Sequence, residues 1–127
     1  MHTQKNNLKR LLIVDDEESI TFTLYQTFIN ASIDCEVVTA SRAEEALQRF
    51  EKSPFDIVIT DLAMPGMDGL ELLAILKKKR PATRVIVITA YGSDDREEKA
   101  YNLGADSYFE KPFDIHQLRD LVIQMLE

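Results

Sequence analysis

Five short apolar runs alternate along the chain with longer segments in which apolar residues recur at helical spacing. The runs at residues 11–14, 57–59 and 85–88 are nearly continuous and rich in β-branched side chains, as in strands buried on both faces of a parallel sheet. The runs at residues 35–38 and 107–109 are more polar, which is typical of edge strands. The pattern predicts one sheet with three central strands and two edge strands.

Helical periodicity follows each of these runs. The apolar helix faces lie within residues 20–31, 43–50, 70–76, 94–102 and 115–125. The fourth segment, from Asp94 to Asn102, is mostly charged, so it should be the least firmly docked helix. Strands that alternate with helices predict a parallel α/β sheet with right-handed crossovers.

Two helix starts have the spacing of a capping box, in which the N-cap side chain and the third helical residue satisfy each other's backbone donors. The pairs are Ser41 with Glu44 and Asp114 with Gln117. Asp68 precedes the third helical segment in a similar way. This spacing predicts helices that begin directly after Ser41, Asp68 and Asp114.

Length and composition are those of one globular domain. We predict a single domain over residues 1–127, in which residues 1–8 form a loose leader. The formal net charge of −7 disfavours direct contact with nucleic acid, because phosphates repel an acidic surface. The single cysteine, Cys35, excludes an intrachain disulfide and suits a reducing cytosol. No apolar run is long enough to span a membrane.

Chemically reactive side chains stand where the predicted strands end. Asp15 and Asp16 follow the first run, Asp61 follows the third, Thr89 ends the fourth and Lys111 follows the fifth. Ligands bind at the carboxyl ends of parallel strands, so these groups should gather at one edge of the sheet. Neighbouring carboxylates need a cation, and Mg²⁺ prefers such oxygen ligands. A carboxylate beside this metal can attack phosphorus, while an ammonium neutralises the transferring oxygens.

Each of these residues has a plainer interpretation when it is taken alone. Asp16 would more often be a helix cap, Thr89 a strand end and Lys111 a solvated charge. Tyr108 would be an edge-strand aromatic that packs on a helix. The functional interpretation rests on their joint order, because chance seldom places such groups after each of the correct strands.

The same residues resemble the receiver domains of bacterial two-component response regulators. The resemblance covers about residues 11–126 and implies a flavodoxin-like (βα)5 three-layer sandwich, with a parallel five-stranded sheet of order 2-1-3-4-5. It rests on Asp15-Asp16, on the run Asp61-Leu62-Ala63-Met64-Pro65-Gly66-Met67-Asp68-Gly69, on Thr89-Ala90 and on Lys111-Pro112-Phe113.

The resemblance implies a role for each residue of the cluster. Asp61 is expected to accept a phosphoryl group from a sensor histidine kinase. Thr89 and Lys111 would hold the phosphoryl oxygens, and the Lys111–Pro112 peptide bond would be cis. The chain would be a phosphorylated signalling domain with slow self-dephosphorylation rather than an enzyme. Mg²⁺ is the expected cofactor, with ligands from Asp15, Asp16, Asp61 and the backbone carbonyl of Ala63.

The resemblance also implies a switch. Phosphorylation would draw Thr89 inward and let Tyr108 move into the vacated space, which changes the surface of the fourth helix, fifth strand and fifth helix. That surface would control an output domain or a downstream protein in the cytoplasm, and homodimerisation on phosphorylation is a further expectation. Tyr91, two residues after Thr89, is expected to shield the site from water and slow hydrolysis.

The sequence has one alternative interpretation outside this family and one open choice within it. Phosphohydrolases of the haloacid dehalogenase group also use a strand-end aspartate, but they usually carry a second aspartate two residues later, where this chain has Ala63. Within the receiver family, the chain is either a free-standing receiver that acts by protein contact or a part of a longer regulator with a DNA-binding or other output domain. The sequence leaves this second choice open.

Overall fold

Strands and helices alternate strictly in the computed structural model, which describes residues 8–127. The leader expected at residues 1–8 therefore lies outside the described residues, apart from Leu8. Within residues 8–127, no helix has both the length and the apolar character that a bilayer crossing requires. The elements are β1 (Lys9–Val14), α1 (Glu18–Asn30), β2 (Cys35–Ala40), α2 (Ala43–Lys52), β3 (Ile57–Asp61), α3 (Gly69–Lys79), β4 (Arg84–Thr89), α4 (Asp94–Asn102), β5 (Ser107–Glu110) and α5 (Ile115–Leu126).

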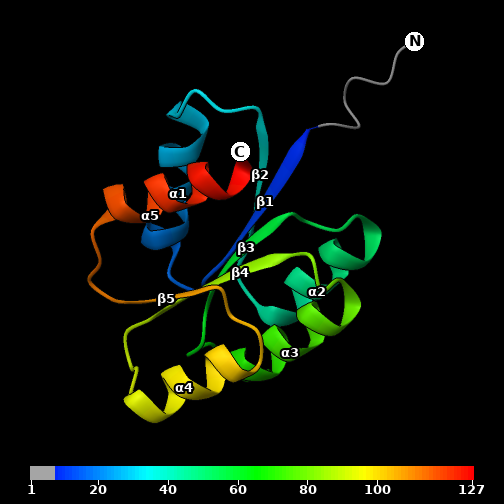
Figure 1. Ribbon diagram of the computed structural model, residues 1–127, viewed down its shortest axis with the longest axis vertical. Coiled ribbons are helices and arrows are strands. Elements are labelled where there is room, and N and C mark those ends of the chain that lie inside the picture. Colours follow the sequence, from blue (N-terminus) through cyan, green and yellow to red (C-terminus); the bar gives the residue numbers. More distant parts are fainter. Residues whose placement is uncertain (1–7) are drawn as a thin grey trace.

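All strand pairs are parallel, and the sheet order is β2-β1-β3-β4-β5, which confirms the predicted order. Helices α1 and α5 cover one face of the sheet, and α2, α3 and α4 cover the other, so the fold has three layers (Figure 1). The chain leaves β1 towards β2 on one side and returns to β3 on the other. The carboxyl ends of β1 and β3 therefore form the crevice in which ligands of such sheets bind.

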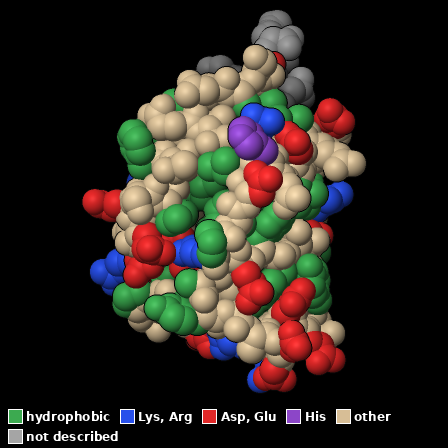
Figure 2. All heavy atoms as spheres, turned by 90° about the vertical axis from the view of Figure 1, so that its left-hand side faces the viewer, with side chains coloured by type: hydrophobic (Ala, Val, Ile, Leu, Met, Phe, Trp, Pro, Cys, Tyr) green, Lys and Arg blue, Asp and Glu red, His purple; other side chains and the backbone are tan. Residues whose placement is uncertain are grey.

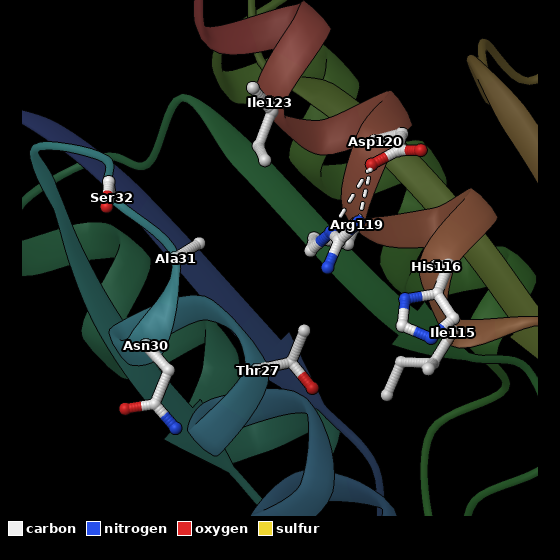
Figure 3. A pocket seen from close by; sticks show the side chains of 9 residues that line it. All are labelled: Thr27, Asn30, Ala31, Ser32, Ile115, His116, Arg119, Asp120 and Ile123. Carbon is white, nitrogen blue, oxygen red and sulfur yellow. Dashed lines mark hydrogen bonds and ion pairs between the residues drawn. The ribbon is translucent and has the colours of Figure 1, made fainter.

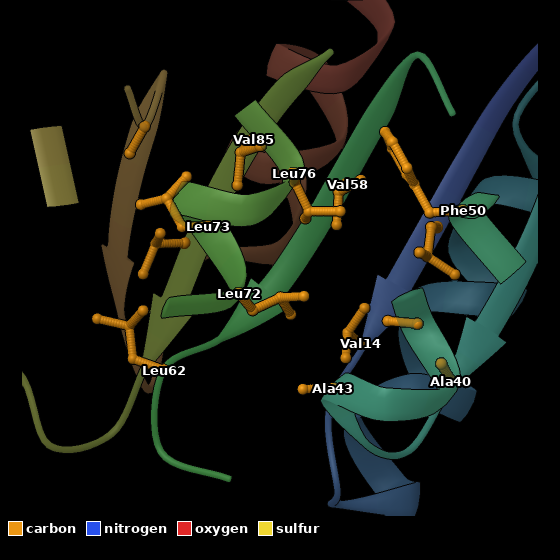
Figure 4. Packing of buried hydrophobic residues seen from close by; sticks show 14 of the residues in the cluster. Val14, Ala40, Ala43, Phe50, Val58, Leu62, Leu72, Leu73, Leu76 and Val85 are labelled. Carbon is orange, nitrogen blue, oxygen red and sulfur yellow. The ribbon is translucent and has the colours of Figure 1, made fainter. Parts of the chain in front are cut away.

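Alternate residues of the central strands contribute to two separate cores. Leu11 and Ile13 of β1 pack with α1 and α5, while Leu12 and Val14 pack with α2 and α3. Figure 4 shows the second of these cores, where side chains of the strands meet those of the covering helices. Burial of each of these aliphatic side chains stabilises the folded state by about 1.5–3 kcal/mol, so the helices on both faces are held tightly against the sheet.

The start of α2 differs from the prediction. Arg42 is its N-cap residue and makes no side-chain cap bond, while the backbone N–H of Ser41 donates to Oε1 of Glu45 at 3.0 Å. The predicted pairing of Ser41 with Glu44 is therefore wrong, because the glutamate one position further along reaches back. The other two predicted helix starts are confirmed by N-cap side chains that accept backbone N–H groups, Asp68 from Leu70 and Asp114 from His116. The Asp114 side chain therefore bonds the second helical residue and not Gln117, the partner that the capping-box spacing predicted.

Helix α4 has the bounds that its charge pattern predicted, and it is the most weakly buried helix. Ala100 is its one buried residue. The Arg96 guanidinium bonds to Asp68 Oδ1 at 3.1 Å and so ties α4 to the loop that follows β3. The backbone hydrogen bond from Leu70, together with Arg96, holds the pKa of Asp68 below its ordinary value. A polar tie of this kind leaves α4 easier to displace than a packed helix.

Candidate functional site

Three aspartates meet at the carboxyl ends of β1 and β3. Asp15 and Asp61 are buried, and Asp16 is exposed beside them. One carboxylate oxygen of each lies within 4.8 Å of those of the other two, which is close enough for a shared metal ion. Two strands that are neighbours in the sheet, but far apart in sequence, thus bring these acids together as the strand-end argument predicted.

Lys111 places an ammonium group among these acids. Its Nζ lies 2.9 Å from Oδ2 of Asp61, 2.9 Å from Oδ2 of Asp15 and 2.7 Å from Oε1 of Glu17. Burial alone lowers the pKa of Lys111, but its carboxylate partners outweigh burial and raise that pKa above the ordinary value. The ammonium therefore stays charged throughout the physiological range.

Backbone groups hold the two buried carboxylates in place. The N–H of Glu17 donates to Oδ1 of Asp15, and the N–H of Ala63 donates to Oδ1 of Asp61, both at 2.9 Å. Oδ1 of each carboxylate thus accepts a hydrogen bond from the backbone, and Oδ2 of each lies next to Lys111 Nζ. This arrangement gives both acids a defined direction before any ligand arrives.

The second oxygen of Asp15 is incompletely satisfied. Oδ2 is buried and lies near Lys111, yet it has no partner with hydrogen-bond geometry among the described residues. Burial raises the pKa of Asp15 above its ordinary value, against the effects of the Glu17 N–H and Lys111. A buried oxygen of this kind is costly unless a further positive ligand approaches it. The donor set, which is entirely carboxylate oxygen, fits a hard divalent cation such as Mg²⁺.

Thr89 and Tyr108 lie on the β4 and β5 side of this edge. Thr89 is 1% exposed, and its Oγ1 accepts the backbone N–H of Tyr91 at 3.3 Å. The hydroxyl of Tyr108 is buried without a partner among the described residues, and it would lie 2.5 Å from a Cβ added to Gly92. Tyr108 is thus turned towards the loop between β4 and α4, where glycine leaves room for it.

The Lys111–Pro112 peptide bond is cis, as the resemblance implied. Ala63 is exposed two residues after Asp61, and its methyl side chain brings no functional group to the site. Tyr91 is 80% exposed, so its ring does not cover the carboxylates in this structure. Glu17 was present in the sequence pattern, directly after Asp15 and Asp16, but no local signal assigned it to Lys111.

A separate pocket lies between the end of α1 and the outer side of α5. Figure 3 shows the apolar and polar residues that line it, among which Arg119 pairs with the neighbouring Asp120. His116 is exposed on its rim, and none of the strand-end carboxylates lines it. The pocket therefore does not belong to the carboxylate site.

Among the described residues, the face that carries α5 and α4 is rich in acidic side chains. Figure 2 shows many acidic side chains on this face, with hydrophobic side chains between them and few lysines or arginines. The acidic side chains on this face are in line with the formal net charge of −7.

Known proteins resemble this chain along almost its whole length. The family model for the response regulator receiver domain matches residues 11–123. Sporulation initiation phosphotransferase F of Bacillus subtilis is 37% identical over 118 residues, which are 93% of this chain and 94% of that protein. The DNA-binding transcriptional regulator NtrC of Escherichia coli is 37% identical over 110 residues, which are 87% of this chain but 23% of that regulator.

A solved structure gives the same result for the fold. The CheY-like response regulator receiver domain protein from Methanospirillum hungatei superposes with a TM-score of 0.85 and 33% sequence identity, and the match covers 94% of both chains. The chain thus spans nearly all of the Bacillus subtilis relative but only about a quarter of the Escherichia coli regulator.

Proposed function

Because the chain belongs to the family of response regulator receiver domains, we propose that Asp61 accepts a phosphoryl group from a sensor histidine kinase in a Mg²⁺-dependent transfer. The observation that carries this proposal is the placement of Asp61, which is buried at the end of β3 between Lys111 and two further aspartates. Intact mass after incubation with a small phosphoryl donor tests it directly.

The residues that would hold Mg²⁺ are Asp15, Asp16 and Asp61, with the backbone carbonyl of Ala63 as a further ligand. The unsatisfied oxygen of Asp15 and the mutual approach of the three carboxylates support this assignment. When bound, the ion neutralises charge on the transferring phosphoryl oxygens. The same carboxylates repel one another when no cation is present, so metal binding should stabilise the fold.

In the transfer step, one carboxylate oxygen of Asp61 forms a bond to phosphorus while the bond from phosphorus to the donor nitrogen breaks. Lys111 is placed to hold an oxygen of the moving group, and the Thr89 hydroxyl is proposed to hold another. No group needs to remove a proton from Asp61, because the carboxylate is already ionised when it attacks. Positioning and charge neutralisation therefore account for the reaction.

The proposed output is a shift of Thr89 and Tyr108 that displaces α4. Two observations support α4 as the movable element. It buries only Ala100, and its link to the loop after β3 is a solvent-exposed ion pair between Arg96 and Asp68, which is weak and easily broken. The altered face of α4, β5 and α5 would act on an output domain or a partner protein in the cytoplasm. Residues 1–127 would thus serve as one receiver, either free-standing or joined to further domains.

Removal of the Asp15 charge is predicted to stabilise the metal-free protein. Because burial raises the pKa of Asp15, the folded state binds its proton more tightly than the unfolded state does. The protonated side chain of Asp15 therefore adds to the free energy of unfolding at low pH. This contribution is lost as the pH rises from the ordinary aspartate pKa through the higher pKa of the folded state. At pH 7, Asp15→Asn should raise Tm by roughly 3–5 °C, the equivalent of about 1 kcal/mol for a domain of this size.

Thermal unfolding with and without Mg²⁺ measures both sides of this prediction. Wild-type protein should gain about 2.7 kcal/mol when Mg²⁺ is present at one hundred times its Kd. Asp15→Asn should lose most of that gain, and its advantage over wild type in metal-free buffer should shrink as the pH falls towards 4. An equal gain from Mg²⁺ in both proteins would show that Asp15 does not contribute to the metal site.

Tyr91→Ala is predicted to shorten the lifetime of the phosphoryl group if Tyr91 folds over the site after phosphorylation. The ring is exposed in this structure, so it would have to turn inward to exclude water. The measurement is the rate of loss of phosphorylated protein by intact mass after the donor is removed, with Tyr25→Ala on α1 as the control. Equal rates in wild type and Tyr91→Ala would remove Tyr91 from the mechanism.

Homodimerisation through the α4 face is predicted to accompany activation. Tyr101 and Leu103 are large hydrophobic residues at the end of α4 that stay exposed, and a self-complementary contact could cover them. Sedimentation with beryllofluoride and Mg²⁺ should show a dimer, while Asp61→Asn under the same conditions should remain monomeric. Monomer at high concentration in both cases would contradict the prediction.

A further inference from the structure

Glu17 occupies an unusual position at the start of α1. It is the N-cap residue of that helix, but its side chain makes no cap hydrogen bond. Its carboxylate instead reaches Lys111, 94 residues later in the chain, with Oε1 2.7 Å from Nζ. A glutamate is not a preferred N-cap residue, because Ser, Thr, Asn and Asp accept the free backbone N–H groups better. Glu17 is therefore poorly suited to helix capping and well placed beside the carboxylate site.

The three oxygens of Glu17, Asp15 and Asp61 fill the surroundings of the Lys111 ammonium, all within 2.9 Å of Nζ. Two of the three ammonium donors are hydrogen-bonded, to Glu17 and to Asp61, while Asp15 Oδ2 lies 2.9 Å from Nζ without hydrogen-bond geometry. An arriving phosphoryl oxygen therefore enters a space that three carboxylate oxygens already occupy, and it competes with them for the ammonium. The side chains of Asp15 and Asp61 are 0% and 4% exposed, and both are also held by backbone N–H groups. The Glu17 side chain is 55% exposed, and Lys111 is its single side-chain partner in the described part of the chain.

We propose that Glu17 is a positioning residue that competes with the phosphoryl group for Lys111 and thereby slows phosphorylation of Asp61. This inference rests on the proposed function of Asp61. Glu17 is the neighbour that can leave at the lowest cost, because water can solvate its carboxylate as it swings away. Transfer to Asp61 therefore includes the loss of the Glu17–Lys111 ion pair, and the strength of that pair limits the rate.

Two variants separate the ion pair from the charge that Glu17 carries. Glu17→Gln keeps the length but holds the ammonium less strongly, since a neutral acceptor makes a weaker hydrogen bond than an ionised one. Glu17→Asp keeps the charge but is one methylene shorter, so it loses its reach to Lys111. Glu18→Gln is the matched control, because it removes the same charge from the adjacent exposed position on α1.

The test is the initial rate of phosphorylation by acetyl phosphate at saturating Mg²⁺, followed by intact mass because the chain has no tryptophan. Glu17→Gln and Glu17→Asp should both react roughly threefold faster than wild type, the size of effect that a partly exposed ion pair can exert. Glu18→Gln should react at the wild-type rate. In a Lys111→Gln background, Glu17→Gln should give no gain, since residues that act through one another are not additive.

Other outcomes would overturn the inference. Faster reaction in Glu17→Gln and Glu18→Gln but not in Glu17→Asp would show that net charge alone sets the rate. Unchanged or slower reaction in both Glu17 variants, with wild-type Tm, would show that Glu17 does not compete for Lys111. If wild-type protein gained no phosphoryl group at all, the proposed function of Asp61 would fail first, so the two failures are distinguishable.

Discussion

Asp61→Asn is expected to abolish phosphoryl incorporation. Wild-type protein incubated with acetyl phosphate and Mg²⁺ should gain one phosphoryl group by intact mass, and the variant should gain none. The amide of asparagine is a poor nucleophile, and it replaces the one carboxylate that is both buried at the end of β3 and paired with Lys111. Omission of Mg²⁺ should suppress the gain in wild type, because the acidic site then repels the anionic donor.

The control for this experiment is Asp34→Asn, which makes the same chemical change at an exposed residue of the loop before β2. It should be phosphorylated as wild type is. Circular dichroism should show the same fold in all three proteins. Full phosphorylation of Asp61→Asn would place the acceptor elsewhere. If wild type stayed unmodified by acetyl phosphate and by a panel of histidine kinases, a binding module that works without phosphorylation would explain the chain better.

Gly69→Ala is expected to be among the most damaging single substitutions outside the carboxylates. A Cβ at this position would lie 2.4 Å from Cα of Leu62 and 2.8 Å from the backbone oxygen of Asp61. Both contacts are with backbone, so no side chain can turn aside to relieve them. The segment that follows Asp61 would have to shift, at a cost of about 2–3 kcal/mol. Chemical denaturation should show this loss in the free energy of unfolding.

The same shift should weaken metal binding, because it moves the backbone that orients Asp61 through the Ala63 N–H. Gly66→Ala is the matched control. It introduces a positive-φ penalty of about 1–2 kcal/mol, but its added Cβ would meet only the flexible side chain of Glu44. Gly66→Ala should therefore keep the stabilisation by Mg²⁺ that Gly69→Ala loses. Equal stability of Gly69→Ala and wild type would mean that this loop relaxes freely.

Much of the fold could be predicted because its signals are local. The runs around residues 11–14, 57–59 and 85–88 became the buried strands β1, β3 and β4, since β-branched residues in continuous apolar runs favour sheets covered on both faces. Helix α4 has the bounds that its charged segment indicated. The error at Ser41 arose because Glu44 and Glu45 adjoin each other, and the composition of the turn does not decide which one reaches back.

The candidate site was predicted in part. Asp15, Asp16, Asp61 and Lys111 lie together, because strand ends in a parallel sheet share one edge. The ligand role of the Ala63 carbonyl, the switch of Thr89 and Tyr108 and the shielding by Tyr91 remain predictions. Glu17 directly follows the two aspartates in the sequence, but no local pattern assigns it a role, since its partner Lys111 is 94 residues away.

The sequence by itself determined the elements, their buried faces and the identity of the groups at the strand ends, because periodicity and turn chemistry act over a few neighbouring residues. Only the tertiary structure decided which distant atoms touch. It brought Glu17 to Lys111, Arg96 to Asp68 and Gly69 against Leu62. These contacts require the helices and loops to be placed to within about an ångström. A local pattern of side chains does not specify distances between segments that meet only when the sheet is assembled.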